Sequence, residues 1–219
     1  MVRCPTCLSK NSMSRRLQDK VERKLSRKVS VRTIKQSFLI VCEGRNTEPE
    51  YFNAFRLTSA QVRAVGKGLG TVNLVREAAS VRHEELRKGK IYDQYWVVFD
   101  KDDFPDADFN EAVRLAEAEG FRSAYSNQSF EFWFILHYML YRGPMHRNQY
   151  TDVLTKLTGI PYSKRAGFAT GLYNLLYDKL DVAIRNAEVL DTEFCGISPA
   201  KAESSTTVYK LVRELRNFL

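Results

Sequence analysis

Short apolar runs alternate along the chain with segments whose apolar residues have helical spacing. The runs predict four β-strands, at residues 37–42, 61–66, 95–99 and 121–126. The spacing between and after them predicts four helices, one that begins near Thr47 and others at 72–88, 109–119 and 129–140. Since crossover connections between parallel strands are right-handed, this alternation predicts an α/β fold with a parallel sheet flanked by helices.

Residues at the ends of these segments agree with the helix predictions. Thr47 and Glu50 have the spacing of a capping box, and Pro49 suits a first helical turn. Asp108 is expected to cap the helix at 109–119, and Gly120 is expected to end it.

The C-terminal third of the chain is predicted to be mostly helical. It closes on an amphipathic segment at 205–218, whose apolar residues fall at helical spacing. We therefore expect three parts: an N-terminal arm at 1–36, an α/β domain at 37–145, and a helical region at 146–219 packed on that domain.

The net charge of +8 is concentrated in the arm. Residues 1–36 hold eleven Lys and Arg against Asp19 and Glu22, whereas the rest of the chain is nearly neutral. Two interpretations stay open, a solvated and partly disordered tail or a nucleic-acid anchor that releases counterions from phosphates. The candidate nucleic-acid contacts are Arg15, Arg16, Lys20, Arg23, Lys24, Arg27 and Lys28.

Cysteine spacing and hydropathy narrow the class of protein further. Cys4 and Cys7 have the spacing of half a zinc site, but no second CxxC or HxxxH supplies the other ligands. An inert pair is therefore preferred, and zinc stays open. No apolar run reaches the ~18–20 residues that a membrane span needs, so we expect a cytoplasmic protein without a membrane partner.

Acidic residues follow two of the predicted strands directly. Glu43 and Gly44 come after the first strand, and Asp100 and Asp102 after the third. In an open parallel sheet ligands bind beyond the carboxyl ends of the strands, so these carboxylates are expected to share a crevice. They would repel one another unless a cation neutralised them, and oxygen ligands suit Mg²⁺ or Mn²⁺. Taken alone, either segment is better explained as a turn or a solvated loop; the β-α-β spacing between them favours a shared site.

The Glu-Gly pair and the DxD stretch resemble a Toprim domain, the metal-binding fold of type IA topoisomerases, primases and OLD-type nucleases. Four segments resemble more specifically the RloB-like family, a set of Toprim-related proteins encoded near restriction and phage-resistance genes. In chain order they are FLIVCEGRNTEPEYF, VVFDKDDF, AYSNQSFEFWFILHY and STTVYKLVRELR. The resemblance covers about residues 37–219 and leaves the arm outside it.

This resemblance implies roles for particular residues. Glu43 becomes a general acid/base or a metal-linked carboxylate, and Asp100 and Asp102 become metal ligands. Gly44 would let the backbone turn close to a phosphate. The further candidates are Asp103, Glu131 in the crevice and His137, for which a buried core histidine is the alternative.

The implied function is that of a Mg²⁺- or Mn²⁺-dependent Toprim-type nuclease in antiphage defence, acting by abortive infection. RNA is preferred over DNA as substrate, with tRNA as a specific candidate, and a defence-system partner protein is a further expectation. The chain is too short for the tyrosine-bearing domain of a topoisomerase and has no priming elements that we can identify. The alternatives are a non-catalytic regulatory subunit that binds nucleic acid or a nucleotide, and a DNA nuclease.

Overall fold

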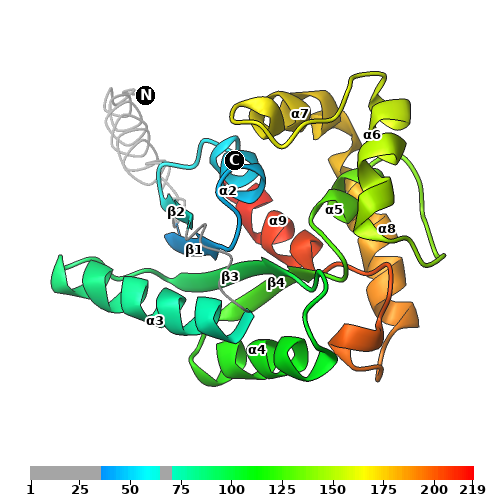
Figure 1. Ribbon diagram of the computed structural model, residues 1–219. Helices are drawn as coiled ribbons and strands as arrows, with labels where there is room; N and C mark the ends of the chain where they lie inside the picture. The colour runs from blue at the N-terminus through cyan, green and yellow to red at the C-terminus, as the bar shows by residue number, and fades with distance from the viewer. Residues whose placement is uncertain (1–35, 65–70) are drawn as a thin grey trace, which may run out of the picture. The chain divides into compact units, whose positions relative to one another are not determined.

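Four parallel strands form one sheet in the part of the chain that the structure describes, residues 36–64 and 71–219. In this computed structural model the strand order is β2-β1-β3-β4 (Figure 1). The strands are β1 (Phe38–Cys42), β2 (Ala60–Ala64), β3 (Gln94–Asp100) and β4 (Arg122–Ser126). The predicted parallel α/β fold is confirmed.

Helices connect the strands and build the C-terminal part of the chain. They are α2 (Thr47–Asn53), α3 (Thr71–Arg87), α4 (Asp106–Ala118), α5 (Glu131–Ile135), α6 (Tyr150–Thr158), α7 (Phe168–Leu176), α8 (Leu180–Glu193) and α9 (Val208–Arg216). Three 3₁₀ segments accompany them: η1 (Arg147–Gln149), η2 (Tyr177–Lys179) and η3 (Pro199–Lys201). The predicted helical C-terminal region is therefore present.

The sheet carries a separate apolar core on each face, because successive strand residues point to opposite sides. Leu39 and Phe99 pack on one face with side chains of α3 and α4. Ile40 and Trp96 pack on the other face with side chains of α2, α5 and α9. Figure 1 shows α3 and α4 together on one side of the sheet and α9 on the other. The central strands β1 and β3 are thus covered on both faces, which explains their continuous apolar runs.

The helical C-terminal part shares the second of these cores with the sheet. Leu154, Leu176 and Leu190, from α6, α7 and α8, belong to the same apolar cluster as Ile40. A domain boundary near residue 145 stays a prediction. The described residues, 36–64 and 71–219, belong to one compact unit.

The segment before α9 covers the free edge of β4. The amide of Thr207 donates to the carbonyl oxygen of Tyr125 at 2.8 Å, and the Thr207 hydroxyl accepts from the Tyr125 amide at 2.9 Å. Ser126 and Thr206 form an antiparallel bridge beside them. These contacts tie the C-terminal helix to the strand edge.

The helix predicted at 129–140 is much shorter in the structure. α5 begins at Glu131 and ends at Ile135. Its residues are buried on all sides, so the sequence carried no polar face from which a period could mark the helix end. Beyond it, the carbonyl oxygen of Leu136 accepts a hydrogen bond from Asn186 Nδ2 at 2.8 Å instead of continuing a helix.

Two predicted caps are also corrected. Asn46, not Thr47, precedes α2, and no side chain caps that helix. The Glu50 carboxylate instead accepts hydrogen bonds from the amides of Gly167 at 2.7 Å and Ala169 at 3.2 Å, at the start of α7. α4 begins at Asp106, so Asp108 lies inside its first turn. Gly120 has a φ of 75°, as expected of a residue just past a helix end.

Several predictions fall on residues 1–35, which lie outside the described part of the chain. They include the Cys4–Cys7 pair and all seven basic residues proposed as nucleic-acid contacts. Within residues 36–64 and 71–219, no helix combines the length and apolar character that a membrane crossing requires.

Candidate metal and phosphodiester site

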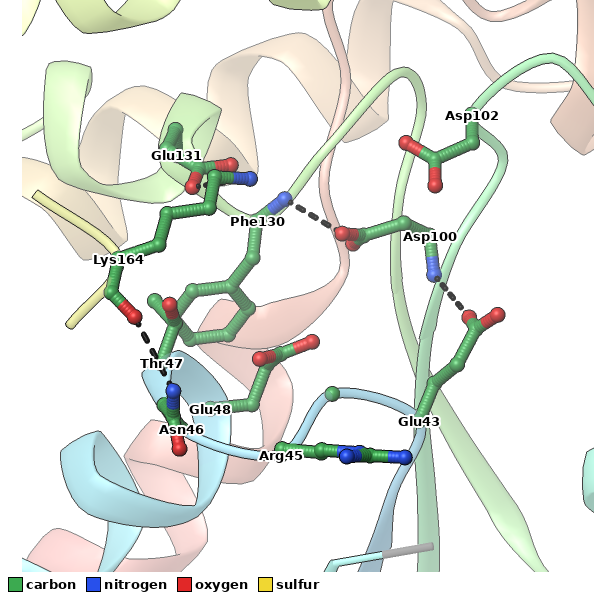
Figure 2. A pocket seen from close by; sticks show the side chains of 11 residues that line it. Glu43, Arg45, Asn46, Thr47, Glu48, Asp100, Asp102, Phe130, Glu131 and Lys164 are labelled. Carbon is green, nitrogen blue, oxygen red and sulfur yellow. Dashed lines mark hydrogen bonds and ion pairs between the residues drawn. The ribbon is translucent and has the colours of Figure 1, made fainter. Parts of the chain in front are cut away.

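A pocket with a volume of about 310 Å³ lies at the carboxyl ends of β1 and β3. Figure 2 shows side chains from the loop after β1, from α2, from the end of β3, from α5 and from the loop before α7 around it. The lining residues are Glu43, Gly44, Arg45, Asn46, Thr47, Glu48, Asp100, Asp102, Phe130, Glu131 and Lys164. The three carboxylates expected to meet at the strand ends therefore line one pocket.

Glu43 stands at the end of β1, one residue beyond Cys42. Its amide extends the strand pairing by donating to the carbonyl oxygen of Val98 at 2.9 Å. Its carboxylate accepts a hydrogen bond from the Asp100 amide at 3.3 Å. Burial, with the nearby charges of Asp102 and Glu48, raises the pKa of Glu43 to about 7, although the Asp100 amide opposes the shift. A carboxyl group with this pKa can exchange a proton near neutral pH.

Asp100 is the last residue of β3 and its carboxylate is buried. One carboxylate oxygen, Oδ2, accepts a hydrogen bond from the Phe130 amide at 3.0 Å, and the other, Oδ1, is buried without a partner. Burial first, and then the charges of Glu48, Asp102 and Glu131, raise the pKa of Asp100 well above its usual range. A buried carboxylate oxygen without a donor is costly, and a bound cation or a proton would relieve it.

Asp102 lies two residues further on, with its backbone in the left-handed region at a φ of 43°. Its carboxylate lines the pocket but is paired with the Nη1 of Arg147 at 2.6 Å. The neighbouring carboxylate of Asp103 is also paired with Arg147 and does not line the pocket. Within residues 36–64 and 71–219 no three His, Cys, Asp or Glu side chains are placed so that they could hold a metal ion together. The metal assignment therefore stays a prediction.

Glu48 is an acidic residue of this pocket that the sequence analysis missed. Its side chain lies in the first turn of α2, is only 7% exposed, and points into the same space as Asp100 (Figure 2). Burial raises the pKa of Glu48, with a further rise from Glu131, while backbone hydrogen bonds and Lys164 oppose it. The sequence did contain a signal: Glu48 is a second acidic residue only five positions after Glu43, in the first turn of the helix that follows β1.

Gly44 has a packing reason to be glycine. A Cβ atom at this position would collide with the Glu48 carboxylate. Gly44 is not among the glycines with positive φ, so space and not backbone conformation excludes a side chain here. The close approach found in the structure is to Glu48; an approach to phosphate stays a prediction.

Glu131 lines the pocket, as predicted, but both of its carboxylate oxygens already have donors. Oε1 accepts from the Tyr162 hydroxyl and pairs with Lys164 Nζ, each at 2.7 Å. Oε2 accepts from the Ser129 hydroxyl at 2.7 Å. Burial alone would raise the pKa of Glu131, but the ion pair with Lys164 and these hydrogen bonds outweigh it and lower the pKa. Glu131 is thus suited to hold Lys164 at the pocket.

Lys164 is a cationic residue that the helical region contributes and that the sequence analysis missed. Its segment is fastened to the first loop of the sheet, since its carbonyl oxygen accepts from Asn46 Nδ2 at 3.1 Å. Glu50 holds the same segment through the amides of Gly167 and Ala169. An isolated lysine in a C-terminal loop gives no sequence signal for such a site; only the packing of α7 against α2 brings it there.

His137 does not line the pocket. It is 2% exposed, its Nδ1 lies 3.0 Å from the carbonyl oxygen of Trp133, and its ring packs edge-on against the Trp133 ring at 4.9 Å. Burial lowers the pKa of His137 to about 4, so the ring is neutral at pH 7. These contacts describe a core histidine, and a catalytic role for it has no support in its position.

Comparison with known proteins gives the family. A family model described as "RloB-like protein" matches residues 38–215, and the chain belongs to this family. No curated protein and no solved structure gave a significant match. The match spans the sheet, the pocket and most of the helical C-terminal part.

Proposed function

We propose that the pocket at the ends of β1 and β3 is a divalent-metal-dependent phosphodiesterase site and that the protein is a nuclease. The observation that carries the proposal is the buried Asp100 carboxylate, whose Oδ1 has no partner although Glu43, Glu48 and Asp102 surround the same pocket. Burial and the charges of Glu48 and Asp102 raise the pKa of both Asp100 and Glu43, and a cation at the pocket would offset both effects.

The carboxylate oxygens of this pocket are the kind of ligand that Mg²⁺ and Mn²⁺ prefer. Asp100 and Asp102 would hold the ion, with Glu43 as a third carboxylate at the same pocket. When bound, such an ion activates water and stabilises the negative charge that develops on a phosphate.

The chain's own side chains supply the remaining requirements of phosphodiester hydrolysis. Glu43, with a pKa of about 7, can accept the proton of an attacking water. Lys164 and Arg45 bring positive charge to a pocket whose other ionisable lining residues are acidic, and an anionic substrate needs such charge. The Lys164 ammonium group is held by the buried Glu131, so its position does not depend on the substrate.

RNA, with tRNA as the specific candidate, is the substrate class we propose, and antiphage defence by abortive infection is the proposed setting. The support is the concentration of charge in residues 1–36 together with membership in the RloB-like family. If the arm anchors nucleic acid, deletion of residues 1–35 should weaken binding and flatten its salt dependence. Equal salt slopes for the two proteins would remove the arm from substrate binding.

Purified full-length protein incubated with tRNA, other RNA and DNA tests the activity. Cleavage is expected with Mg²⁺ or Mn²⁺ and not with EDTA, and it should disappear in Asp100→Asn protein purified in the same way. Expression in phage-infected cells, wild type against the same variant, tests the defence role. Cleavage of none of the three substrates, or equal cleavage by the variant, would overturn the nuclease proposal.

A second candidate is a binding module that holds a nucleotide or nucleic acid without cleaving it. The observation in its favour is the ion pair between Asp102 and Arg147, which engages one of the proposed metal ligands. Tight, metal-independent binding of RNA or a nucleotide without turnover would select this candidate.

A further inference from the structure

Arg147 joins two acidic residues at the edge of the pocket. Its Nη1 lies 2.6 Å from Asp102 Oδ1, and its Nη2 pairs with Asp103 Oδ2. Arg147 belongs to η1, at the entry to α6, whereas both aspartates belong to the loop after β3. A cationic group from the helical region thus occupies a carboxylate that lines the candidate active site.

The backbone around this ion pair is fixed independently of it. The Asp102 amide donates to the carbonyl oxygen of Gln128 at 2.9 Å. The Gln128 side-chain oxygen accepts from the Arg147 amide at 3.4 Å. Asp102 and Gln128 both have positive φ, at 43° and 79°. The loops after β3 and β4 are therefore held to each other by a main-chain hydrogen bond, and to η1 through the Gln128 side chain; neither contact needs the Arg147 guanidinium.

The ion pair between Arg147 and Asp102 is weak enough for a metal ion to displace the arginine. The side chains of Arg147 and Asp102 are 34% and 32% exposed, so water partly screens their attraction. Ion pairs of this exposure contribute at most about 1 kcal/mol. A divalent cation at Asp100 and Asp102 would carry twice the charge of a guanidinium, and it would also meet the unpartnered Asp100 Oδ1.

We propose that Arg147 is a positioning residue that neutralises Asp102 until a divalent cation replaces it, and that the released guanidinium then binds a phosphate of the substrate. This inference rests on the proposed metal-dependent site and adds an order of binding. The metal ion binds first and frees the Arg147 guanidinium, which then binds the nucleic acid. A guanidinium is well matched to the second task because it binds phosphate through two parallel N–H groups.

Two affinities, that for the metal ion and that for RNA, distinguish this role of Arg147 from a purely structural one. A structural brace would hold Asp102 in place for the metal, and its removal would weaken metal binding. A competing cation does the opposite, and its removal should tighten metal binding. A charge acting only through space would change the metal and RNA affinities independently and leave the coupling between them intact.

The test uses the full-length protein with and without Arg147→Ala. Metal affinity is measured in the wild-type background, and nucleic-acid affinity in the Glu43→Gln background, in which cleavage is blocked. Calorimetry measures Mn²⁺ affinity, and labelled tRNA measures nucleic-acid affinity with and without Mn²⁺. Arg142→Ala is the matched control, because Arg142 is paired with Glu193 at 2.8 Å and neither residue lines the pocket. A circular dichroism melt of each protein checks that the fold is kept.

Arg147→Ala should bind Mn²⁺ about fivefold more tightly, which corresponds to the loss of an ion pair worth about 1 kcal/mol. The factor by which Mn²⁺ improves tRNA binding should fall about fivefold. Arg142→Ala should change neither the Mn²⁺ affinity nor this factor. Weaker or unchanged Mn²⁺ binding in Arg147→Ala, or an unchanged coupling factor, would overturn the proposal. Absence of Mn²⁺ binding in both proteins would overturn it together with the metal site. If the coupling is found but the wild type cleaves no nucleic acid, only the nuclease proposal fails.

Discussion

The Glu43 carboxylate accepts a hydrogen bond from the backbone amide of Asp100 at 3.3 Å, so the two acidic residues at the ends of β1 and β3 are joined directly. The parallel register of the strands produces this contact, because Cys42 pairs with Val98 and leaves Glu43 beside the next residues of β3. Glu43 is thereby held at the pocket by the sheet itself. This position suits Glu43 for proton transfer at the pocket.

Glu43→Gln should lose at least about 100-fold in cleavage rate, a common effect of removing a general base. Glutamine keeps the size of the side chain and can still accept the Asp100 hydrogen bond. It also removes a carboxyl group whose raised pKa costs stability at neutral pH, so the melting temperature should not fall. A gel assay with Mn²⁺ and tRNA measures the rate. Full activity in this variant would exclude Glu43 from proton transfer.

Asp100→Asn should stabilise the metal-free protein, because it removes a buried carboxylate whose pKa is raised by burial and by neighbouring acids. The gain should be present at pH 8 and should shrink as the pH falls, because the wild-type carboxyl group becomes neutral at low pH. Added Mn²⁺ should stabilise the wild type but not the variant. Urea unfolding with and without Mn²⁺ measures both effects.

Asp106→Asn is the control for this experiment, since Asp106 is 52% exposed and pairs with Lys101 outside the pocket. It should leave the Mn²⁺ response intact. A loss of stability in metal-free Asp100→Asn would show that the unpartnered oxygen is not a strained feature of the site.

Gly44→Ala should destabilise the protein by about 1–3 kcal/mol, the usual range for forcing an atom into filled space. The added Cβ would meet the Glu48 carboxylate, and this buried side chain must move to admit it. Glu48→Ala removes the colliding group, so Gly44→Ala should cost much less in that background. Equilibrium unfolding of the two single variants and the double variant gives the coupling energy. Additive effects would mean that the collision is not the reason for glycine.

His137 should make stability depend on pH in a defined window. Its pKa is lowered to about 4 by burial, whereas an unfolded histidine titrates near pH ~6.5. As the pH falls from about 6.5 to 4, the unfolded chain takes up a proton that the folded chain excludes, so stability should fall by about 3 kcal/mol. Above pH ~6.5 this contribution is constant.

His137→Asn isolates this effect, because asparagine can still donate to the Trp133 carbonyl oxygen and does not titrate. Glu43 and Asp100 have raised pKa values and contribute a slope of opposite sign, with stability lost as the pH rises. The difference between the wild type and the variant at each pH therefore carries the histidine contribution. His83→Asn, at an exposed position on α3, should match the wild type. A difference curve that is flat from pH 4 to 6.5 would contradict the prediction.

The sequence by itself determined the fold class and the acidic core of the pocket. Continuous apolar runs predict strands buried on both faces, and strand–helix alternation makes those strands parallel. Glu43 and Asp100 were predictable because the carboxyl ends of parallel strands meet at one edge of a sheet, whatever the rest of the chain does. These inferences need only local periodicity and chain topology.

The tertiary structure alone decided which distant groups complete the site. Lys164 and Arg147 reach it because helix packing folds separate segments over the strand ends, and no local pattern encodes that approach. The same packing ended α5 at Ile135 and directed Glu50 to the start of α7. Burial and pairing then give each carboxylate different surroundings: Asp100 is buried with one oxygen unpartnered, both oxygens of Glu131 accept hydrogen bonds, and Asp102 is paired with a guanidinium. Desolvation and ion pairing depend on what surrounds a group in space, so the residues with the same chemistry in the sequence acquired different roles only on folding.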